Sequence, residues 1–222
     1  MEDVPFSDKN RASDAQEIIE AAPAADAASI DWRNGLPTLT GSKMTLRDLR
    51  LSDAPSLLAM LATEEVAWFI SPQPTTVEGF ERFIAWTHRE RAAGNCICFA
   101  VVPEGTDTAA GLFQIREITS GLGTAEWGFA IGSAYWGSGL FLEGARLALN
   151  FVFDVLGVHR LEARAAVQNG RGNGALRKLG AVQEGILRKS FLRNGEYLDQ
   201  VLWTIMDEDW RQARKVWGVT VH

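Results

Sequence analysis

The sequence has only two cysteines, and no apolar run approaches the roughly 20 residues that a membrane-spanning helix needs. Two cysteines cannot form a disulfide framework or a four-cysteine zinc site, and the three histidines show no spacing that would complete a metal site. The start, MEDVPFSDKN, lacks the basic first residues and apolar core of a signal peptide. We therefore expect a cytoplasmic protein without a metal, in which Cys96 and Cys98 are core residues.

Basic charge is scarce as well. The formal net charge of the whole chain is −6. Residues 1–36 hold eight acids and three bases, so this segment carries −5 of the total and leaves −1 for the rest. A nearly neutral body has no field that attracts phosphate backbones, so we expect no nucleic-acid partner.

The length of 222 residues fits one domain with an appendage. We assign the domain to residues 37–217 and the appendage to residues 1–36, where the stretch EAAPAADAAS is rich in alanine and is interrupted by Pro23. This composition is typical of a mobile or loosely docked extension. The alternative is a short helix, capped by Ser13, that covers part of a site or a partner subunit.

Apolar periodicity predicts a mixed α/β (α+β) body built around one sheet. The predicted strands are residues 44–49, 96–102, 112–118, 124–131, 161–167, 181–192 and 197–206. The predicted helices are one that starts at residues 52–55 and others at 76–92, 140–156 and 173–179. Asn194-Gly195 between the last two apolar runs indicates a hairpin.

The most informative segment is a glycine turn between an apolar strand and a long amphipathic helix. The strand ends near Ile131, and Gly132, Gly137 and Gly139 precede the helix. Free amides at a helix N-terminus favour an anion, and glycines let the backbone approach a phosphate closely. No Gly-Lys-Ser/Thr follows, so this is no P-loop, and Leu142 breaks the dinucleotide-binding fingerprint. By itself the turn suits a structural role as well as an anion site.

The turn and several segments outside it each match part of one known family. These segments are Tyr135-Trp136-Gly137-x-Gly139, Leu46-Arg47-x-Leu49, Ala125-Glu126-x-Gly128-Phe129, Leu156 to Ala163, Leu176-x-Lys178-Leu179-Gly180 and Gly195-Glu196-Tyr197-x-Asp199. Together they resemble the RimJ/RimL-type branch of the GNAT superfamily of N-acetyltransferases, over about residues 38–210. The resemblance implies a mixed, mostly antiparallel sheet with splayed central strands and flanking helices. It also implies acetyl-CoA-dependent transfer of an acetyl group to a primary amine, either a protein N-terminus or a small molecule.

The resemblance further implies where acetyl-CoA binds. The main chain of Ile131, Gly132 and Ser133 would pair with the pantetheine arm. The pyrophosphate would lie on the turn and helix start, formed by Trp136, Gly137, Ser138, Gly139, Leu140 and Phe141. Ala134 stands where the superfamily prefers Arg or Gln, so one side-chain contact to phosphate is missing. Asn169 aligns with an asparagine that contacts the cofactor arm, and a helix cap is its alternative role.

Transfer to an amine also needs a base, because a primary amine is mostly protonated near pH 7. Glu126 is the candidate, since it is the only charge on strand 124–131 and lies on the face opposite Trp127, Phe129 and Ile131. Apolar walls raise the pKa of a carboxylic acid, which would suit a base. The resembling enzymes carry a proposed base at this position. A solvated or paired strand carboxylate is the alternative.

Two further points leave the function open. Gly172 stands where related enzymes carry a serine as a possible general acid, and residues 173–179 contain no tyrosine. Trp68 and Phe69 precede a break in the chain and are candidates for the acceptor pocket, with core packing as their alternative. There are two rival functions. One is a catalytically weak module that binds an acyl-CoA or a partner, and the other is a protein that binds another nucleotide. The resemblance is also compatible with a homodimer.

Overall fold

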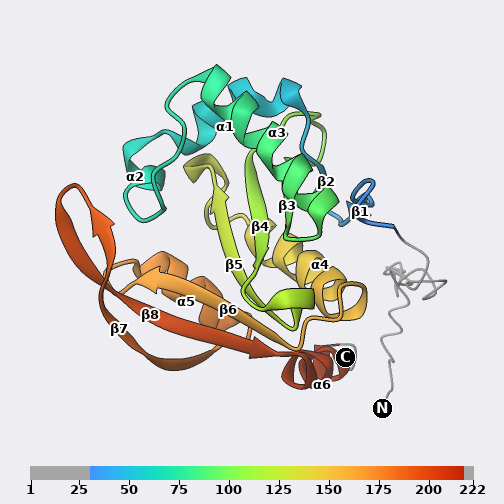
Figure 1. Cartoon of the computed structure of the whole chain (residues 1–222), viewed down its shortest axis with the longest axis vertical. Helices are drawn as coiled ribbons and strands as arrows, with labels where there is room; N and C mark the ends of the chain where they lie inside the picture. The colour runs from blue at the N-terminus through green and yellow to red at the C-terminus, as the bar shows by residue number, and fades with distance from the viewer. Residues whose placement is uncertain (1–30, 218–222) are drawn as a thin grey trace, which may run out of the picture.

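The computed structural model describes residues 31–217, so most of the predicted extension lies outside the described residues. Eight strands form one sheet in the order β1-β2-β3-β4-β5-β6-β8-β7 (Figure 1). The strands are β1 (Leu39–Thr40), β2 (Met44–Asp48), β3 (Cys96–Pro103), β4 (Gly111–Glu117), β5 (Thr124–Ile131), β6 (Arg160–Ala166), β7 (Val182–Arg193) and β8 (Glu196–Met206). The helices are α1 (Ala54–Leu61), α2 (Glu64–Ala67), α3 (Val77–Ala93), α4 (Leu140–Asp154), α5 (Gly170–Lys178) and α6 (Asp207–Trp217).

Every strand and helix predicted for residues 37–217 is present, and the mostly antiparallel mixed sheet is confirmed. The alternative helix capped by Ser13 lies outside the described residues. The predicted hairpin turns at Asn194 and Gly195, whose φ angles are 48° and 81°. Three elements were not predicted, namely β1, α2 and α6. No helix within residues 31–217 has the length and apolar character needed to cross a bilayer.

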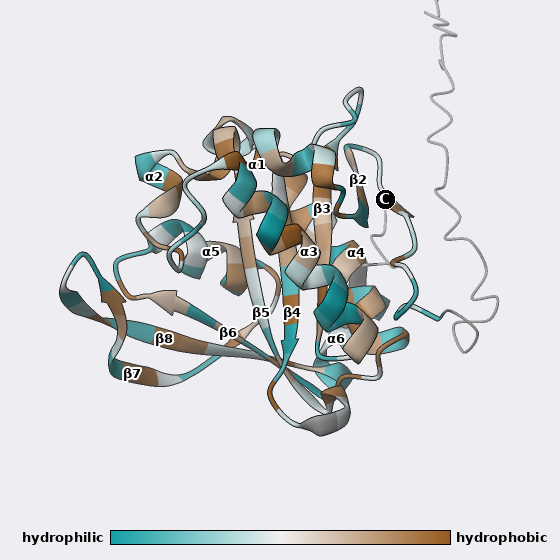
Figure 2. Cartoon of the chain, turned by 45° about the horizontal axis from the view of Figure 1, so that its top comes forward, coloured by the Kyte–Doolittle hydropathy of each residue, from teal (hydrophilic) through white to brown (hydrophobic). Residues whose placement is uncertain are grey.

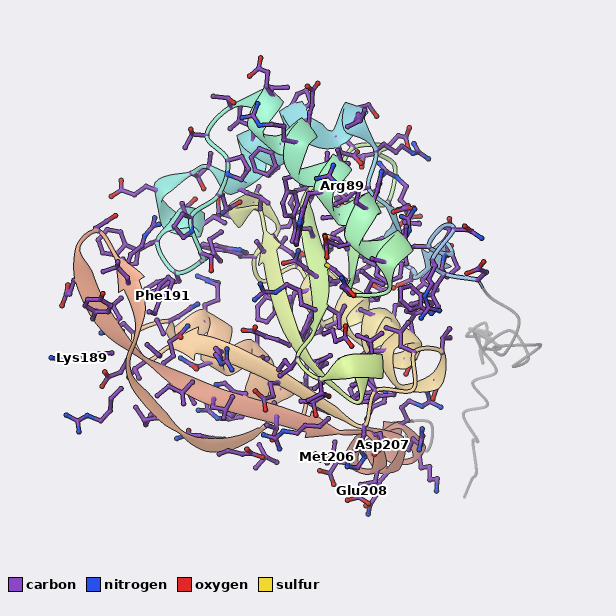
Figure 3. The ribbon with its side chains drawn as sticks, viewed as in Figure 1. Arg89, Lys189, Phe191, Met206, Asp207 and Glu208 are labelled. Carbon is purple, nitrogen blue, oxygen red and sulfur yellow. The ribbon has the colours of Figure 1, made fainter. Side chains whose placement is uncertain are left out.

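The missed helix α6 follows β8 directly, so that Met206 leads into Asp207 and Glu208 (Figure 3). Its first turn is acidic and its last turn is basic, which suits the helix dipole. Trp210 anchors α6 because its side chain is buried in the core. The core also takes in Trp32, which belongs to the predicted extension.

The core has two layers, one on each face of the sheet. β3 is buried along its whole length and is coloured hydrophobic along most of it in Figure 2. Its alternate residues Ile97, Phe99 and Val101 pack with α4, α5 and α6 on one face. Cys98 and Ala100 pack with α1 and α3 on the other face. Burial on both faces explains why the sequence of β3 is an unbroken apolar run.

The sheet divides between β5 and β6. β5 and β6 are parallel and pair over three rows only, Thr124–Glu126 with Arg160–Glu162. Beyond Glu126 the strands diverge, and β6 continues with β8 and β7 as a separate wing (Figure 1). β5 remains paired with β4 up to Ile131. The main chain of β5 therefore has no strand partner on its β6 side after Glu126.

Arg47 and Asp53 form a buried ion pair that fixes the start of α1. The guanidinium donates to both carboxylate oxygens at 2.8 Å, and the side chains are 8% and 2% exposed. Burial alone would raise the pKa of Asp53, but hydrogen bonds from the Arg47 guanidinium and the Arg50 amide outweigh it and lower the pKa. The pair thereby ties β2 to the turn η2 (Leu51–Asp53) before α1.

We expect Asp53→Asn to lower the free energy of unfolding by about 3–5 kcal/mol, because Arg47 then stays buried without its counter-ion. Urea unfolding near neutral pH measures this loss. Since the folded pKa of Asp53 lies below the ordinary 3.8, the pair stabilises the fold fully above that pH and loses its effect as pH falls through the folded pKa. The control, Arg47→Met with Asp53→Leu, removes both charges; an equally large loss there would contradict this explanation.

Candidate active site

A cavity of about 1090 Å³ opens where β5 and β6 separate. Its walls are α2 with the loop that follows, the end of β5, the turn before α4 with the first residues of α4, and α5. Eight of the residues predicted for the site line it, namely Trp68, Phe69, Ile131, Trp136, Gly137, Gly139, Phe141 and Asn169. The remaining predicted residues, Gly132, Ser133, Ser138, Leu140 and Glu126, lie outside its lining.

The glycine turn presents unpaired main-chain amides to this cavity. Gly137 and Gly139 have φ angles of 78° and 86°, a left-handed conformation that favours glycine. The amides of Gly137, Gly139, Phe141 and Leu142 donate to no acceptor within the described part of the chain, and all four residues line the cavity. The side chain of Leu140, by contrast, is buried in the core. The turn therefore has the groups that an anion needs.

The main chain predicted to hold the pantetheine arm is partly occupied. The Trp136 indole donates from Nε1 to the Ile131 carbonyl at 2.9 Å, and the Gly132 amide donates to the Ala110 carbonyl at 2.8 Å. The Ser133 amide has no partner among the described residues. A ligand that used the Ile131 carbonyl would have to share it with Trp136.

Two cations at the cavity were missed from the sequence. Arg171 and Lys178 on α5 line it, and the Arg171 guanidinium lies over the Trp136 ring at 4.3 Å from the centroid. They come from the helix that follows Asn169, seven positions apart and therefore on one helical face. That spacing was the available signal. The two side chains bring positive charge to the cavity, whereas Ala134 brings none.

Asn169 caps α5. Its Oδ1 accepts the Gly172 amide at 2.8 Å, so the cap role is shown, while its place in the cavity wall is compatible with a ligand contact. A Cβ atom added to Gly172 would lie 2.6 Å from Asn169 Nδ2. A side chain at this position therefore requires the cap to move, which explains why glycine is found there.

Glu126 lies between two guanidiniums. Arg116 on β4 donates to it at 2.9 Å and Arg164 on β6 at 3.4 Å, and its side chain is 21% exposed. The predicted environment of apolar walls is therefore wrong, and the alternative of a paired strand carboxylate describes its contacts. Glu126 lies in the last row that joins β5 to β6. The first residue of β5 that lines the cavity is Phe129, three positions further along the strand.

The ion pairs continue past Glu126 across the sheet. Arg164 also contacts Glu162 at 3.5 Å, and Arg160 bridges Glu162 at 3.0 Å and Glu184 at 2.6 Å. Hydrogen bonds from Arg160 lower the pKa of Glu184 to about 2. We call these six residues, with Arg116 and Glu126 at one end, the charge ladder.

The cysteines lie outside the cavity wall. Burial raises the pKa of the Cys96 thiol to about 12 and that of Cys98 well above its usual value. Protonated buried thiols are poor nucleophiles. Among residues 31–217, no group of three or more possible ligands is placed to hold a metal ion.

Residues 43–182, more than half of the chain, match the family model described as "Acetyltransferase (GNAT) domain". The chain belongs to the GNAT acetyltransferase family. It is 30% identical over 193 residues to ribosomal protein uS5-alanine N-acetyltransferase of Escherichia coli, which covers 82% of this chain and 98% of that protein. It is 29% identical over 154 residues to spermidine N(1)-acetyltransferase of the same species, covering 69% and 80%.

A solved GNAT structure agrees with the fold. RimJ of Mycobacterium smegmatis in complex with CoA-disulfide aligns with a TM-score of 0.69 at 21% identity, over 75% of this chain and 83% of that one. The GNAT family membership makes the chain an acyltransferase and sets aside the rival of a protein that binds another nucleotide.

For this GNAT chain we expect Gly172→Ser to lower the free energy of unfolding by about 1 kcal/mol, because the new side chain displaces the Asn169 cap. Thermal unfolding measures the change. Gly170→Ser, two residues earlier on α5, is the matched control, since an added Cβ there meets nothing within 4 Å. Equal losses in the two variants would show that the cap is not the cause.

Proposed function

We propose that the protein transfers an acetyl group from acetyl-CoA directly to a primary amine, with both substrates bound in the gap between β5 and β6. One observation carries this proposal. A single cavity joins the four unpaired amides of the glycine turn, which suit a diphosphate, to the aromatic wall of Trp68 and Phe69. Two reactants held in one cleft need no covalent enzyme intermediate.

The anionic half of acetyl-CoA fits the α4 and α5 end of the cavity. The pyrophosphate would accept hydrogen bonds from the amides of Gly137, Gly139, Phe141 and Leu142, and the α4 dipole favours its charge. Arg171 and Lys178 replace the superfamily's missing side chain at Ala134 as partners of the phosphates. The pantetheine arm would follow the unpaired edge of β5.

The chemistry forms one bond and breaks one. The amine nitrogen attacks the thioester carbonyl carbon, the carbon–sulfur bond breaks, and the amine loses a proton. Glu126 accepts that proton, through a water molecule because its carboxylate lies outside the cavity wall. Arg116 and Arg164 hold the carboxylate in place. The thiolate takes its proton from water or from the attacking amine, because Gly172 offers no acid.

The acceptor is a primary amine, of a protein N-terminus or of a small molecule. The two relatives differ on this point, since one is named for an alanine of a ribosomal protein and the other for spermidine. Trp68 is 43% exposed and, with Phe69, forms the wall that the acceptor would pass. A homodimer and a cytoplasmic location remain predictions.

A second candidate is a catalytically weak module that binds an acyl-CoA or a partner. Two observations favour it. Gly172 supplies no general acid, and Arg116 and Arg164 hold the Glu126 carboxylate in ion pairs. Such a module would bind acetyl-CoA and release no thiol with any amine.

Glu126→Gln should lower kcat by about 10²–10⁴-fold and change the pH profile of kcat, because the amine then has no positioned base. Acetyl-CoA affinity, measured by calorimetry, should stay near wild type. Glu162→Gln is the matched control, since Glu162 is the partner of Glu126 in the same row and contacts the same Arg164. An unchanged rate in Glu126→Gln would exclude Glu126 as the base.

Gly137→Ala should weaken acetyl-CoA binding about tenfold, because a left-handed backbone costs a non-glycine residue roughly 1–2 kcal/mol and the turn relaxes away from its anion-binding shape. Gly121→Ala is the control. Gly121 has a similar φ of 82° and equally open surroundings, but lies outside the cavity wall. If the two variants bind acetyl-CoA equally well, the glycine turn does not hold the diphosphate.

A further inference from the structure

A second hollow of about 200 Å³ lies next to the acceptor wall. Trp68 and Phe69 line both it and the large cavity. The loop after α2 and the turn of the β7–β8 hairpin lie at the same end of the molecule (Figure 1). The other residues of this side hollow are Gln168, Arg193, Asn194, Glu196 and Leu198.

Arg193 is the unusual member of the side hollow. Its Nε atom is buried and has no hydrogen-bond partner. Its guanidinium forms no ion pair with any described residue, although Glu196 is its register partner across the hairpin. The other arginines of the nearby sheet, Arg116, Arg160 and Arg164, all contact carboxylates.

A half-buried guanidinium without a partner is costly, because it has lost part of its hydration and gained nothing in return. Elsewhere in the described fold such charges are paired, as Arg47 is with Asp53. A ligand that enters the side hollow would supply the missing partner. The chain therefore keeps Arg193 ready for a group that the protein itself does not contain.

We propose that the side hollow binds a carboxylate of the acceptor, so that the acceptor class is a primary amine that also bears a carboxylate. The planar guanidinium of Arg193 matches a carboxylate in a two-bond arrangement, and the side-chain amides of Gln168 and Asn194 can donate as well. This inference rests on the proposed function, because the amine must reach the large cavity past Trp68 and Phe69.

The charge of Glu196 narrows the class of ligand that the side hollow can bind. This carboxylate lines the same hollow without pairing with Arg193, so it repels a doubly charged phosphate more than a singly charged carboxylate. Amino acids with the amine and carboxylate at opposite ends, and peptides with an acidic residue near the N-terminus, share the required chemistry. The length of chain between amine and carboxylate distinguishes them.

The test measures thiol release from acetyl-CoA with acceptor pairs that differ only in carboxylate or amide. One arm uses 3-aminopropanoate, 4-aminobutanoate and 6-aminohexanoate with their amides. The other uses alanyl-aspartate and alanyl-asparagine as C-terminal amides, so that only the side-chain carboxylate differs. For at least one pair the acid should exceed its amide about tenfold in kcat/KM. Arg193→Gln should bring that ratio close to one, Arg193→Lys should keep part of it, and Glu196→Gln should increase it.

Arg188→Gln is the matched control, because Arg188 is an exposed arginine of the same strand that lines neither cavity. Equal use of acid and amide by the wild type, or equal ratios in the Arg193 and Arg188 variants, would overturn the inference even when Glu126→Gln still abolishes turnover. If no amine is acetylated, the proposed function fails separately. Calorimetric titration of the acetyl-CoA-bound protein with the same pairs then tests whether the side hollow binds a carboxylate. If Arg193→Gln does not weaken binding of the acids, the side hollow is not their binding site.

Discussion

The short parallel contact between β5 and β6 is the constraint on which the rest of the site depends. Its last row places Glu126 directly beside Glu162, and like charges in register disfavour pairing. Arg164 lies between the two carboxylates and compensates for them at this row. β6 has a full set of antiparallel partners in β8, so it loses little by leaving β5. The charge ladder thus marks the point where the sheet divides.

The division of the sheet gives the cavity two ends of opposite character. At one end the glycine turn and α5 offer amides and cations, and at the other α2 and the loop after it offer aromatic rings. The neighbouring side hollow adds charges of both signs from the β7–β8 hairpin. The first end suits the anionic half of acetyl-CoA in the proposed function. The second is built from a four-residue helix and a hairpin tip, which other chains can vary without disturbing the sheet.

Local signals in the sequence were sufficient for the main elements. Asn194-Gly195 predicted the hairpin, and the apolar run of β3 predicted a buried strand, because each depends on neighbouring residues only. The environment of Glu126 was not predictable in this way. Arg116 comes from ten residues before it and Arg164 from 38 residues after it, so only the strand order brings them together. The free guanidinium of Arg193 was missed for the same reason, because the sequence alone does not show which side chains lie near it in the fold.

In the proposed reaction, the lack of a general acid slows transfer less than the lack of a base would. A thiol has a pKa of about 8.5, so a thiolate is a tolerable leaving group near neutral pH without a proton donor. The attacking amine starts at about 7.7–8.0 for an N-terminus or about 10.4 for a lysine-like amine, and it must lose a proton before it can react. Replacing a serine by Gly172 therefore removes assistance from the easier proton transfer and leaves the Asn169 cap intact. The same reasoning favours acceptors with a low amine pKa, because a smaller fraction of such an amine is protonated near neutral pH.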